Sequence, residues 1–528
     1  MAAVIALAAC QPVATVPKAA RGGTAVEALV GQASVLNPLF ETNETTRDVN
    51  ELIYQGLTTI DSHQNVVGQL ASGWAISSDH LTYTFDIRSD VKWGDGEPFG
   101  VDDVLFTFHV LQDLEYQQPG AEDWRQLGIA AGGPGQVVFS LRAPDASFPL
   151  SLRIGIIPKH IFNGMAPEQI ADSPYSGIKA FGTGPFKVGS INQLAITLDR
   201  NPYASPQPYL DHLVLRTYPA SDPQSAIRAV LNGTADLVGG IQPQEVDTLM
   251  GRNDLVVQES RMFTNSFVTF NVGGDGQQFF SDPKVRLALV QAIDRSRVVS
   301  EVFGGRADVD PSPIPTADWA YSAAAANLHP FDSLAAAAAL DSAGWTIDQS
   351  SSTKIRSKKG VPFHVTLVAA DSYPNVEIAN SISQQLGEVG IQVDVKPLPA
   401  SKLLQDDLLT HSYEMALISI DVGPDPDQYS LWHSGPDAGS LNFAYSRGWG
   451  LIDKDLEDGR AAVDPPARLA AYIDFQMLMA DAAPAIFIYA SRYEYAVSQR
   501  VHGVHMNSAI EPYDRFEYVT DWYVNTTG

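Results

Sequence analysis

The residues best suited to binding chemistry follow an apolar segment in the C-terminal quarter of the chain. Residues 414–420 (EMALISI) predict a strand, and the loop 421–427 (DVGPDPD) after it places carboxylates at Asp421 and Asp425. Ligands of α/β proteins bind in loops beyond the carboxyl ends of parallel strands, where a carboxylate can pair with a cationic group. Asp and Pro are also ordinary turn formers. Two interpretations therefore stay open, a ligand-binding loop and a plain turn.

Aromatic side chains lie close to this loop in the sequence. Tyr429, Trp432 and Trp449 carry amphipathic rings of the kind that line binding pockets, although each ring on its own is more often part of a core. His433 has no carboxylate or second histidine at ligand spacing. We therefore keep Tyr429 and Trp432 as candidates for the floor of a pocket, and we expect neither a metal nor another cofactor.

The common sequence signatures of catalysis are absent. The chain has no G-x-S-x-G, no H-E-x-x-H and no phosphate-binding loop, and the run 132–135 (GGPG) predicts only a hairpin turn. Acidic pairs are numerous among the 61 Asp and Glu residues, but no spacing among them indicates a catalytic pair. We therefore expect a binding protein and not an enzyme. The alternative from another class is a hydrolase that acts on cell-wall peptides.

Length and charge limit the possible partners. A chain of 528 residues exceeds what one core usually organises, so two or three domains are expected. Hydrophobic residues make up 45% of the chain, which is enough for packed interiors. The net charge of -27 argues against nucleic acid and against anionic membrane surfaces, because both would be repelled.

The N-terminus contains the one cysteine of the chain. Residues 7–10 (LAAC) resemble a bacterial lipobox, in which the cysteine, here Cys10, becomes the lipidated first residue of the mature protein. The segment before it is shorter than a full signal peptide, so a chance cysteine in an apolar N-terminus is the competing interpretation. Residues 11–23 are small and proline-containing, as in a tether. No later apolar run reaches the length of a membrane span, so any membrane contact is expected through this lipid alone.

The most informative stretch for the fold runs from residue 70 to residue 108. Apolar and polar residues alternate over 81–87 (LTYTFDI), which predicts a half-buried strand. Residues 94–98 (GDGEP) interrupt the chain, and apolar residues then recur over 101–108 (VDDVLFTF) with the spacing of a helix. A second unit of strand, helix and strand over 365–395 predicts an α/β arrangement with a parallel strand pair.

The order of these motifs resembles the family 5 extracytoplasmic solute-binding proteins, which are the peptide and nickel receptors of ABC importers. The family pattern reads A-E-S-W, Y-T-F, F-H-D-G-T-P and A-E-D-V, and the corresponding segments here are 71–74 (ASGW), 83–85 (YTF), 93–98 (WGDGEP) and 101–104 (VDDV). Further matches lie at 182–186 (GTGPF), 200–203 (RNPY) and 285–295 (VRLALVQAIDR).

The resemblance implies an α/β fold of the two-lobe periplasmic-binding-protein type, class II or cluster C, with a third, small inserted domain. Lobe I would comprise residues 24–57, 180–265 and 490–528, after a signal remnant and tether at 1–23. The inserted domain would be 58–179 and lobe II would be 266–489.

The resemblance also implies where a ligand binds. In peptide-binding members, an Asp a few residues before an Asp-Pro pair binds the N-terminal ammonium of the ligand, and Asp421 is the nearest counterpart here. Three residues separate Asp421 from Asp425, whereas the family usually has two, so both stay candidates to face the cleft. The other candidates are Ser419 and Ile420 in the preceding strand, and Gln32, Ala33, Ser34 and Asn37 in a loop that lines the cleft in the family.

For the opposite end of a ligand, the resemblance implies a different contact. Dipeptide receptors of the family carry an Arg before the Tyr and Asn-Pro that lead into a lobe II helix, and this Arg binds the peptide carboxylate. The comparable segment 370–375 (ADSYPN) has no Arg, so we expect no carboxylate clamp there and keep Tyr373 as the candidate contact. Asp371 would suit a longer or cationic ligand, or would only cap the turn.

The function implied by the resemblance is capture of di- or oligopeptides in an interlobe cleft by lobe closure. Delivery would be to the permease subunits of an ABC importer, by a monomer that is extracytoplasmic and either lipid-anchored to the bacterial cell membrane or periplasmic. Within the binding class, an oligosaccharide or a nickel chelate is the alternative ligand.

Overall fold

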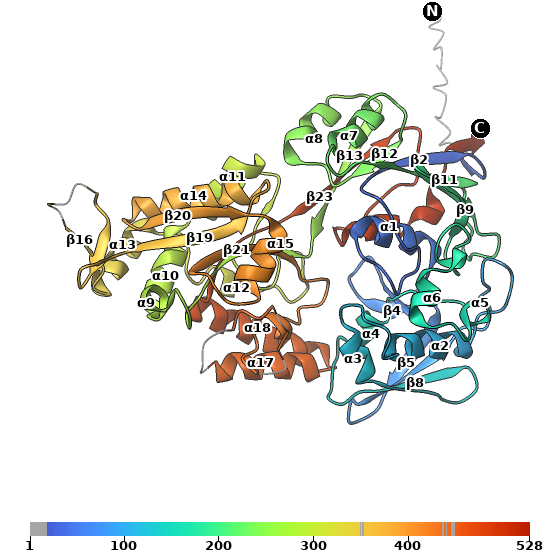
Figure 1. The fold of residues 1–528 in the computed structure, drawn as a ribbon, viewed down its shortest axis with the longest axis horizontal. Helices are drawn as coiled ribbons and strands as arrows, with labels where there is room; N and C mark the ends of the chain where they lie inside the picture. Colours follow the sequence, from blue (N-terminus) through green and yellow to red (C-terminus); the bar gives the residue numbers. More distant parts are fainter. Residues whose placement is uncertain are drawn as a thin grey trace, which may run out of the picture.

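The computed structural model describes residues 18–527, apart from residues 349, 351–352, 436–437, 440 and 445–448. The elements form two large α/β lobes and a smaller domain beside one of them (Figure 1). Cys10, the predicted lipidation site, lies outside the described residues. Over the described part of the chain, no helix combines the length and the apolar character that a membrane span requires.

Lobe I, at the right of Figure 1, is built on an eight-stranded sheet. Strand β2 lies in its middle and runs parallel to both of its neighbours, β11 and β12. Helices α1, α7 and α8 belong to this lobe. In spatial order the strands are β24 (Ala509–Ile510), β13 (Leu255–Met262), β23 (Arg492–Ser498), β12 (Leu237–Gly239), β2 (Thr24–Val30), β11 (His212–Tyr218), β10 (Ala195–Arg200) and β9 (Phe186–Asn192); the helices are α1 (Glu44–Ile53), α7 (Gln224–Leu231) and α8 (Pro243–Met250).

Lobe II, at the left of Figure 1, is built on a six-stranded sheet with helices on both faces. Met415 and Leu417 belong to one buried cluster, and Ala416 and Ile418 to another, because successive side chains of a strand point to opposite faces. In spatial order the strands are β15 (Asp308–Val309), β22 (Ala485–Ala490), β14 (Thr264–Phe270), β21 (Met415–Asp421), β19 (His364–Ala370) and β20 (Gln392–Leu398). The main helices are α10 (Pro283–Ala292), α11 (Arg295–Phe303), α13 (Ser333–Ser342), α14 (Asn375–Glu388), α17 (Gly450–Ala461) and α18 (Pro465–Ala482).

The unit of strand, helix and strand predicted over 365–395 is present in lobe II. It consists of β19, α14 and β20, and β19 runs parallel to both β20 and β21. The carboxyl ends of these strands therefore meet at one edge of the sheet. Asp421 is the last residue of β21 and lies at this edge.

The small domain has a four-stranded antiparallel sheet in the order β5 (Ala71–Ile76), β6 (Thr82–Ile87), β8 (Gln136–Ser140) and β7 (Gly128–Ala131). Tyr83 and Phe85 of β6 are fully buried, as the alternation predicted. The predicted helix is α2 (Val101–Gln112), and residues 132–135 form the turn between β7 and β8. Asp103 in the first turn of α2 is buried and accepts hydrogen bonds from Gly100 N at 3.0 Å and Lys159 N at 2.9 Å.

Two strand crossings join the lobes. One runs from β13 of lobe I through Phe263 into β14 of lobe II, and the other runs from β22 through Ser491 back into β23. The crossings are bonded to each other, because Met262 N donates to Ser491 O at 3.1 Å and Ser491 N donates to Thr264 Oγ1 at 2.8 Å. Between residues 24 and 527, these two crossings are the covalent connections between the lobes.

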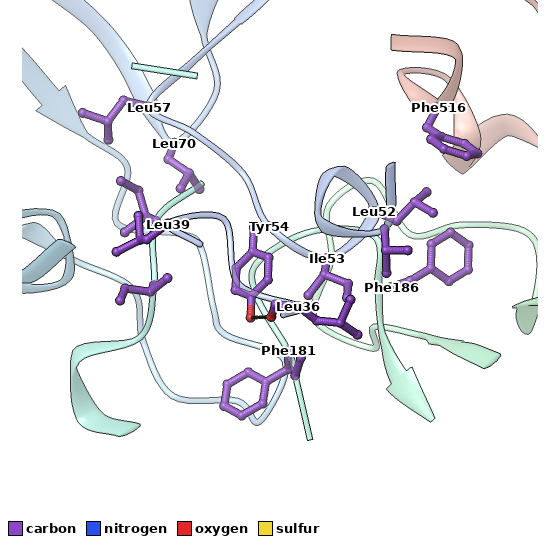
Figure 2. Close-up of a cluster of buried hydrophobic side chains, with 14 of the residues drawn as sticks. Leu36, Leu39, Leu52, Ile53, Tyr54, Leu57, Leu70, Phe181, Phe186 and Phe516 are labelled. Carbon is purple, nitrogen blue, oxygen red and sulfur yellow. Dashed lines mark hydrogen bonds between the residues drawn. The ribbon is translucent and has the colours of Figure 1, made fainter. Parts of the chain in front are cut away.

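A buried apolar cluster fixes helix α1 against the rest of lobe I and the small domain (Figure 2). Leu52 and Ile53 of α1 are fully buried, and Tyr54 donates its hydroxyl to Leu36 O at 3.1 Å. At the other end of the helix, the Asn43 side chain caps α1 by accepting a hydrogen bond from Thr46 N at 2.8 Å. The polar side chains of α1 are therefore presented from a rigid support.

A buried ion cluster ties the C-terminal segment to lobe I. Arg515, in the 3-10 helix Pro512–Phe516, is 2% exposed and donates to Glu27 Oε1 of β2 at 2.8 Å. The same guanidinium binds both carboxylate oxygens of Asp48 in α1, each at 2.8 Å. Tyr495 completes the cluster by donating its hydroxyl to Glu27 Oε2 at 2.8 Å.

Candidate functional site

A cavity of about 620 Å³ lies between the lobes, which is within the range of small-molecule sites. We call it the interlobe cavity. Both lobes and both crossings contribute to its wall. Its lining residues include Glu41, Thr42, Glu44, Arg47, Gln242, Glu494 and Tyr513 from lobe I, Arg306, Pro374, Asn375, Ser419 and Asp421 from lobe II, and Met262, Thr264, Tyr489, Ser491 and Arg492 from the crossings.

Asp421 enters this cavity because of the two-residue period of β21. Ser419 and Asp421 continue one face of the strand beyond the core, whereas Ile420 packs with the cluster on the other face. Oδ1 of Asp421 accepts one hydrogen bond, from Gly423 N at 3.0 Å. The Ser419 hydroxyl lies 2.8 Å from the hydroxyl of Ser266. Asp421 and Ser419 thus face the cavity, and Ile420 supports them from behind.

The electrostatics of the cavity favour a positive ligand group at Asp421. Desolvation by the cavity walls raises the pKa of the Asp421 carboxyl, Arg47 across the cavity lowers it, and Asp514 raises it further. The pKa of the Glu44 carboxyl is also raised, first by burial and then by Asp48. A cation placed between such groups would stabilise their ionised forms.

The positive side chains of the cavity are already paired with carboxylates. Among the described residues, Asp421, Glu44 and Glu494 of the cavity wall form no ion pair. The three arginines of the wall each form an ion pair: Arg47 with Glu41 at 3.2 Å, Arg306 with Asp247 at 2.7 Å, and Arg492 with Asp308 at 2.5 Å and Glu259 at 2.7 Å. The cavity wall therefore has carboxylates whose negative charge no ion pair of the described residues neutralises.

Asp425 lies elsewhere. Its carboxylate forms a bidentate ion pair with Arg468 of α18, at 2.7 and 2.9 Å, and both side chains are largely buried. The two residues line a different cavity, of about 440 Å³, between lobe II and the small domain. Of the two candidate carboxylates, Asp421 lines the interlobe cavity, and Asp425 supports the packing of lobe II.

A substitution at Asp425 should therefore affect stability more than binding. We expect Asp425→Asn to lower the free energy of unfolding by about 2 to 4 kcal/mol, because it leaves the Arg468 charge largely buried without its counterion. The affinity for a ligand of the interlobe cavity should change less than about threefold. Urea unfolding and titration calorimetry measure the two effects. Asp254→Asn, in an exposed pair with Arg252, is the control with little expected loss. A folded Asp425→Asn protein that no longer binds a ligand in the interlobe cavity would contradict this assignment.

The N-terminal candidates lie near the interlobe cavity without lining it. Gln32 donates from Nε2 to Thr217 Oγ1 at 3.2 Å, and Ala33 is half-buried. The Ser34 hydroxyl lies 3.1 Å from the hydroxyl of Thr42, which does line the cavity. Gln32 and Ser34 are exposed and stay proposed contacts for a ligand longer than the cavity.

Asn37 and Tyr373 have partners within the protein. Asn37 is 0% exposed and donates from Nδ2 to Ser176 Oγ at 3.0 Å, which indicates a structural role. Tyr373 donates its hydroxyl to Val302 O at 2.9 Å, and the next two residues, Pro374 and Asn375, line the cavity. Tyr373 itself does not line the cavity, whereas Pro374 and Asn375 do.

The aromatic candidates lie away from the interlobe cavity. Trp432 is 1% exposed and packs with Phe267 in the core of lobe II, as the interpretation of a core residue predicts. Tyr429 stacks on His433 with their ring centroids 3.9 Å apart, and the Arg460 guanidinium carbon lies 3.9 Å from the centroid of the Tyr429 ring. His433 Nε2 is 3.1 Å from Glu457 Oε1, and the described residues contain no group of three or more metal-ligating side chains.

Several residues that line the interlobe cavity were not predicted from the sequence. Glu41 precedes α1, Glu44 and Arg47 lie at its start, and Tyr489 and Arg492 come from the crossings. A signal for α1 exists in the cap Asn43 followed by an acidic first turn. No local pattern shows that two distant strands cross between lobes, so the crossing residues required the structure.

Known proteins share both the sequence pattern and the fold. Residues 65–441 match the family described as bacterial extracellular solute-binding proteins, family 5 Middle. The oligopeptide-binding protein AppA of Bacillus subtilis (strain 168) is 25% identical over 494 residues, which covers 92% of this chain and 89% of AppA.

Solved structures agree over nearly the whole chain. AppA from Bacillus subtilis in complex with a nonapeptide has a TM-score of 0.75 at 24% identity and covers 96% of this chain and 100% of AppA. CtaP, an ABC transporter substrate-binding protein from Listeria monocytogenes, has a TM-score of 0.81 at 24% identity, with 96% and 99% covered. These likenesses confirm the predicted α/β periplasmic-binding-protein fold. The chain belongs to the bacterial extracellular solute-binding proteins of family 5.

Proposed function

We propose that this protein is the substrate-binding protein of an ABC importer and captures peptides in the interlobe cavity. The observation that carries the proposal is Asp421, a carboxylate at the carboxyl end of β21 that lines the cavity without an ion pair among the described residues. An N-terminal ammonium group is the ligand group that such a carboxylate would bind. The name of AppA as an oligopeptide-binding protein supports the same ligand class.

Capture would proceed by closure of the lobes about the two crossings. A ligand that touches both lobes stabilises the closed form by its higher affinity for that form. Asp421 and Ser419 would contact the ligand from lobe II, and Glu44 and Gln242 from lobe I. The peptide backbone would lie extended, held by main-chain groups near Ser419 and, for longer ligands, by the loop at 32–34.

The same proposal implies where the protein acts and which partners it has. The closed form would present the outer surfaces of both lobes to the permease subunits of the importer. The protein would act outside the cytoplasm as a monomer, anchored through a lipid on Cys10. It would release its ligand unaltered, which separates it from a peptide hydrolase.

A thermal-shift screen tests the ligand class. Ala-based peptides of two to nine residues, oligosaccharides and a nickel chelate are added separately to the purified protein. We expect stabilisation by peptides, since a ligand that binds only the folded state raises the apparent stability. A shift with sugars or nickel alone would overturn the peptide proposal. Mass spectrometry of the incubated peptides should recover them intact, and timed release of fragments would favour the hydrolase.

A further inference from the structure

A second, smaller cavity lies beneath helix α1. Its volume is about 190 Å³, and the side chains of its wall that matter here are Glu41, Arg47, Asn50, Glu51, Arg153 and Tyr513. We call it the side chamber. Three of these residues, Glu41, Arg47 and Tyr513, also line the interlobe cavity, so the two spaces are neighbours. A volume of this size equals about six water molecules, which leaves room for an ammonium or guanidinium group with part of its aliphatic stem.

Two acceptors at the side chamber lack a partner. The Glu51 side chain is half-buried and forms no hydrogen bond or ion pair among the described residues. Asn50 is 2% exposed and donates from Nδ2 to Glu41 Oε1 at 3.0 Å, but its Oδ1 is buried with no hydrogen-bond partner in the described chain. Buried acceptors are normally satisfied in native proteins, so the unpartnered Asn50 Oδ1 beside the Glu51 carboxylate indicates a group that the protein itself does not supply.

The charges around the side chamber leave a negative excess. Arg153 is engaged by two carboxylates of the C-terminal segment, Glu511 at 2.8 Å and Asp514 at 2.5 Å. The other arginine, Arg47, is engaged by Glu41 at 3.2 Å. Three carboxylates therefore already outnumber the two arginines, and an ionised Glu51 would add a fourth negative charge.

We propose that the side chamber is a subsite for a cationic ligand side chain, so that the preferred substrates are peptides that contain lysine or arginine. This inference rests on the proposed peptide capture and names its substrate class. A peptide whose amino terminus pairs with Asp421 in the interlobe cavity would pass its basic side chain by Arg47 and Tyr513 into the side chamber. The Glu51 carboxylate and Asn50 Oδ1 would accept hydrogen bonds from the cation there.

The titration of Glu51 supports this geometry. Burial raises the pKa of the Glu51 carboxyl to about 8, Arg153 opposes the shift, and Asp514, Glu41 and Glu511 add to it. The empty chamber would therefore hold a largely protonated Glu51 at pH 7. A bound cation favours the ionised carboxylate and lowers its pKa, so binding releases a proton. Affinity for a basic peptide, relative to its norleucine match, should then rise as the pH increases towards about 8.

The test uses matched alanine pentapeptides in titration calorimetry. Lysine is placed at each position in turn, and a second series carries norleucine, which has the same stem length without the charge. We expect at least tenfold tighter binding of lysine at one position in the wild-type protein. Glu51→Gln should reduce this preference for lysine over norleucine to less than threefold. Glu97→Gln, at an exposed carboxylate of the small domain, is the control that should keep the full preference.

Two results would overturn the inference: no position with a preference for lysine, or a preference that survives Glu51→Gln. Failure of both series to bind would instead contradict the proposed peptide capture. Proton release by the wild-type protein gives a measurement that does not depend on any variant. In buffers with different ionisation enthalpies, the preferred lysine peptide should release more protons at pH 7 than its norleucine match, and equal release would also count against the subsite.

Discussion

Replacing Asp421 with alanine is expected to lower the affinity for a peptide with a free amino terminus by about 30- to 1000-fold. The basis is the cost of removing one partner from a desolvated charge pair, which is about 2 to 4 kcal/mol. The loss should be large because Asp421 lies in the cavity wall with one hydrogen bond, to Gly423 N, and no counterion among the described residues. Titration calorimetry of the wild-type and variant proteins measures it.

N-terminal acetylation of the peptide provides the matched comparison. An acetylated peptide lacks the ammonium group, so it should bind the wild-type protein weakly and lose less than about threefold in Asp421→Ala. Asp275→Asn, at an exposed carboxylate of lobe II outside the cavity, should leave both affinities unchanged. Equal losses for the free and acetylated peptides in Asp421→Ala would show that Asp421 does not bind the ammonium group.

The second large effect concerns stability. Arg515→Met should lower the free energy of unfolding by about 3 to 5 kcal/mol, because Glu27 and Asp48 would stay buried without their shared counterion. Burial already raises the pKa of Glu27 in the presence of Arg515. Without the arginine this pKa should rise further, so the folded variant binds protons that the unfolded chain has lost. The destabilisation should therefore be smaller at pH 5 than at pH 8.

The control for this substitution is Arg252→Met. Arg252 pairs with Asp254 on the surface, where both side chains are about half exposed, so no measurable change in stability is expected at either pH. Urea unfolding followed by circular dichroism measures both variants. If Arg515→Met were as stable as the wild-type protein at pH 8, the cluster would not anchor the C-terminal segment to lobe I.

Local patterns in the sequence predicted much of the fold. The alternation over 81–87 gave β6, because Tyr83 and Phe85 bury one face of the strand. The spacing after Gly100 gave α2, whose first turn is held by Asp103. Such elements are determined by residues close together in the chain, so periodicity and capping are sufficient to find them.

The candidate site depended on contacts that no local pattern contains. The sequence favoured Asp421 but left Asp425 as a candidate, and the structure separates them because Arg468 on α18 binds Asp425. Trp432 has the residue type of a pocket floor, yet Phe267 from a distant strand encloses it. Glu51 became notable only because Arg153 is already engaged by the C-terminal segment. Pairings between distant segments decide which polar groups stay free, and these free groups are what a ligand can bind.

The central claim is that two lobes close on an unaltered peptide, and small-angle X-ray scattering tests it most directly. The radius of gyration is measured with and without the peptide that gives the largest thermal shift, for the wild-type protein and for Asp421→Ala. We expect the wild-type radius to fall when the peptide is added, and the variant radius to stay constant at the same peptide concentration. An unchanged wild-type radius at saturating peptide would contradict capture by lobe closure.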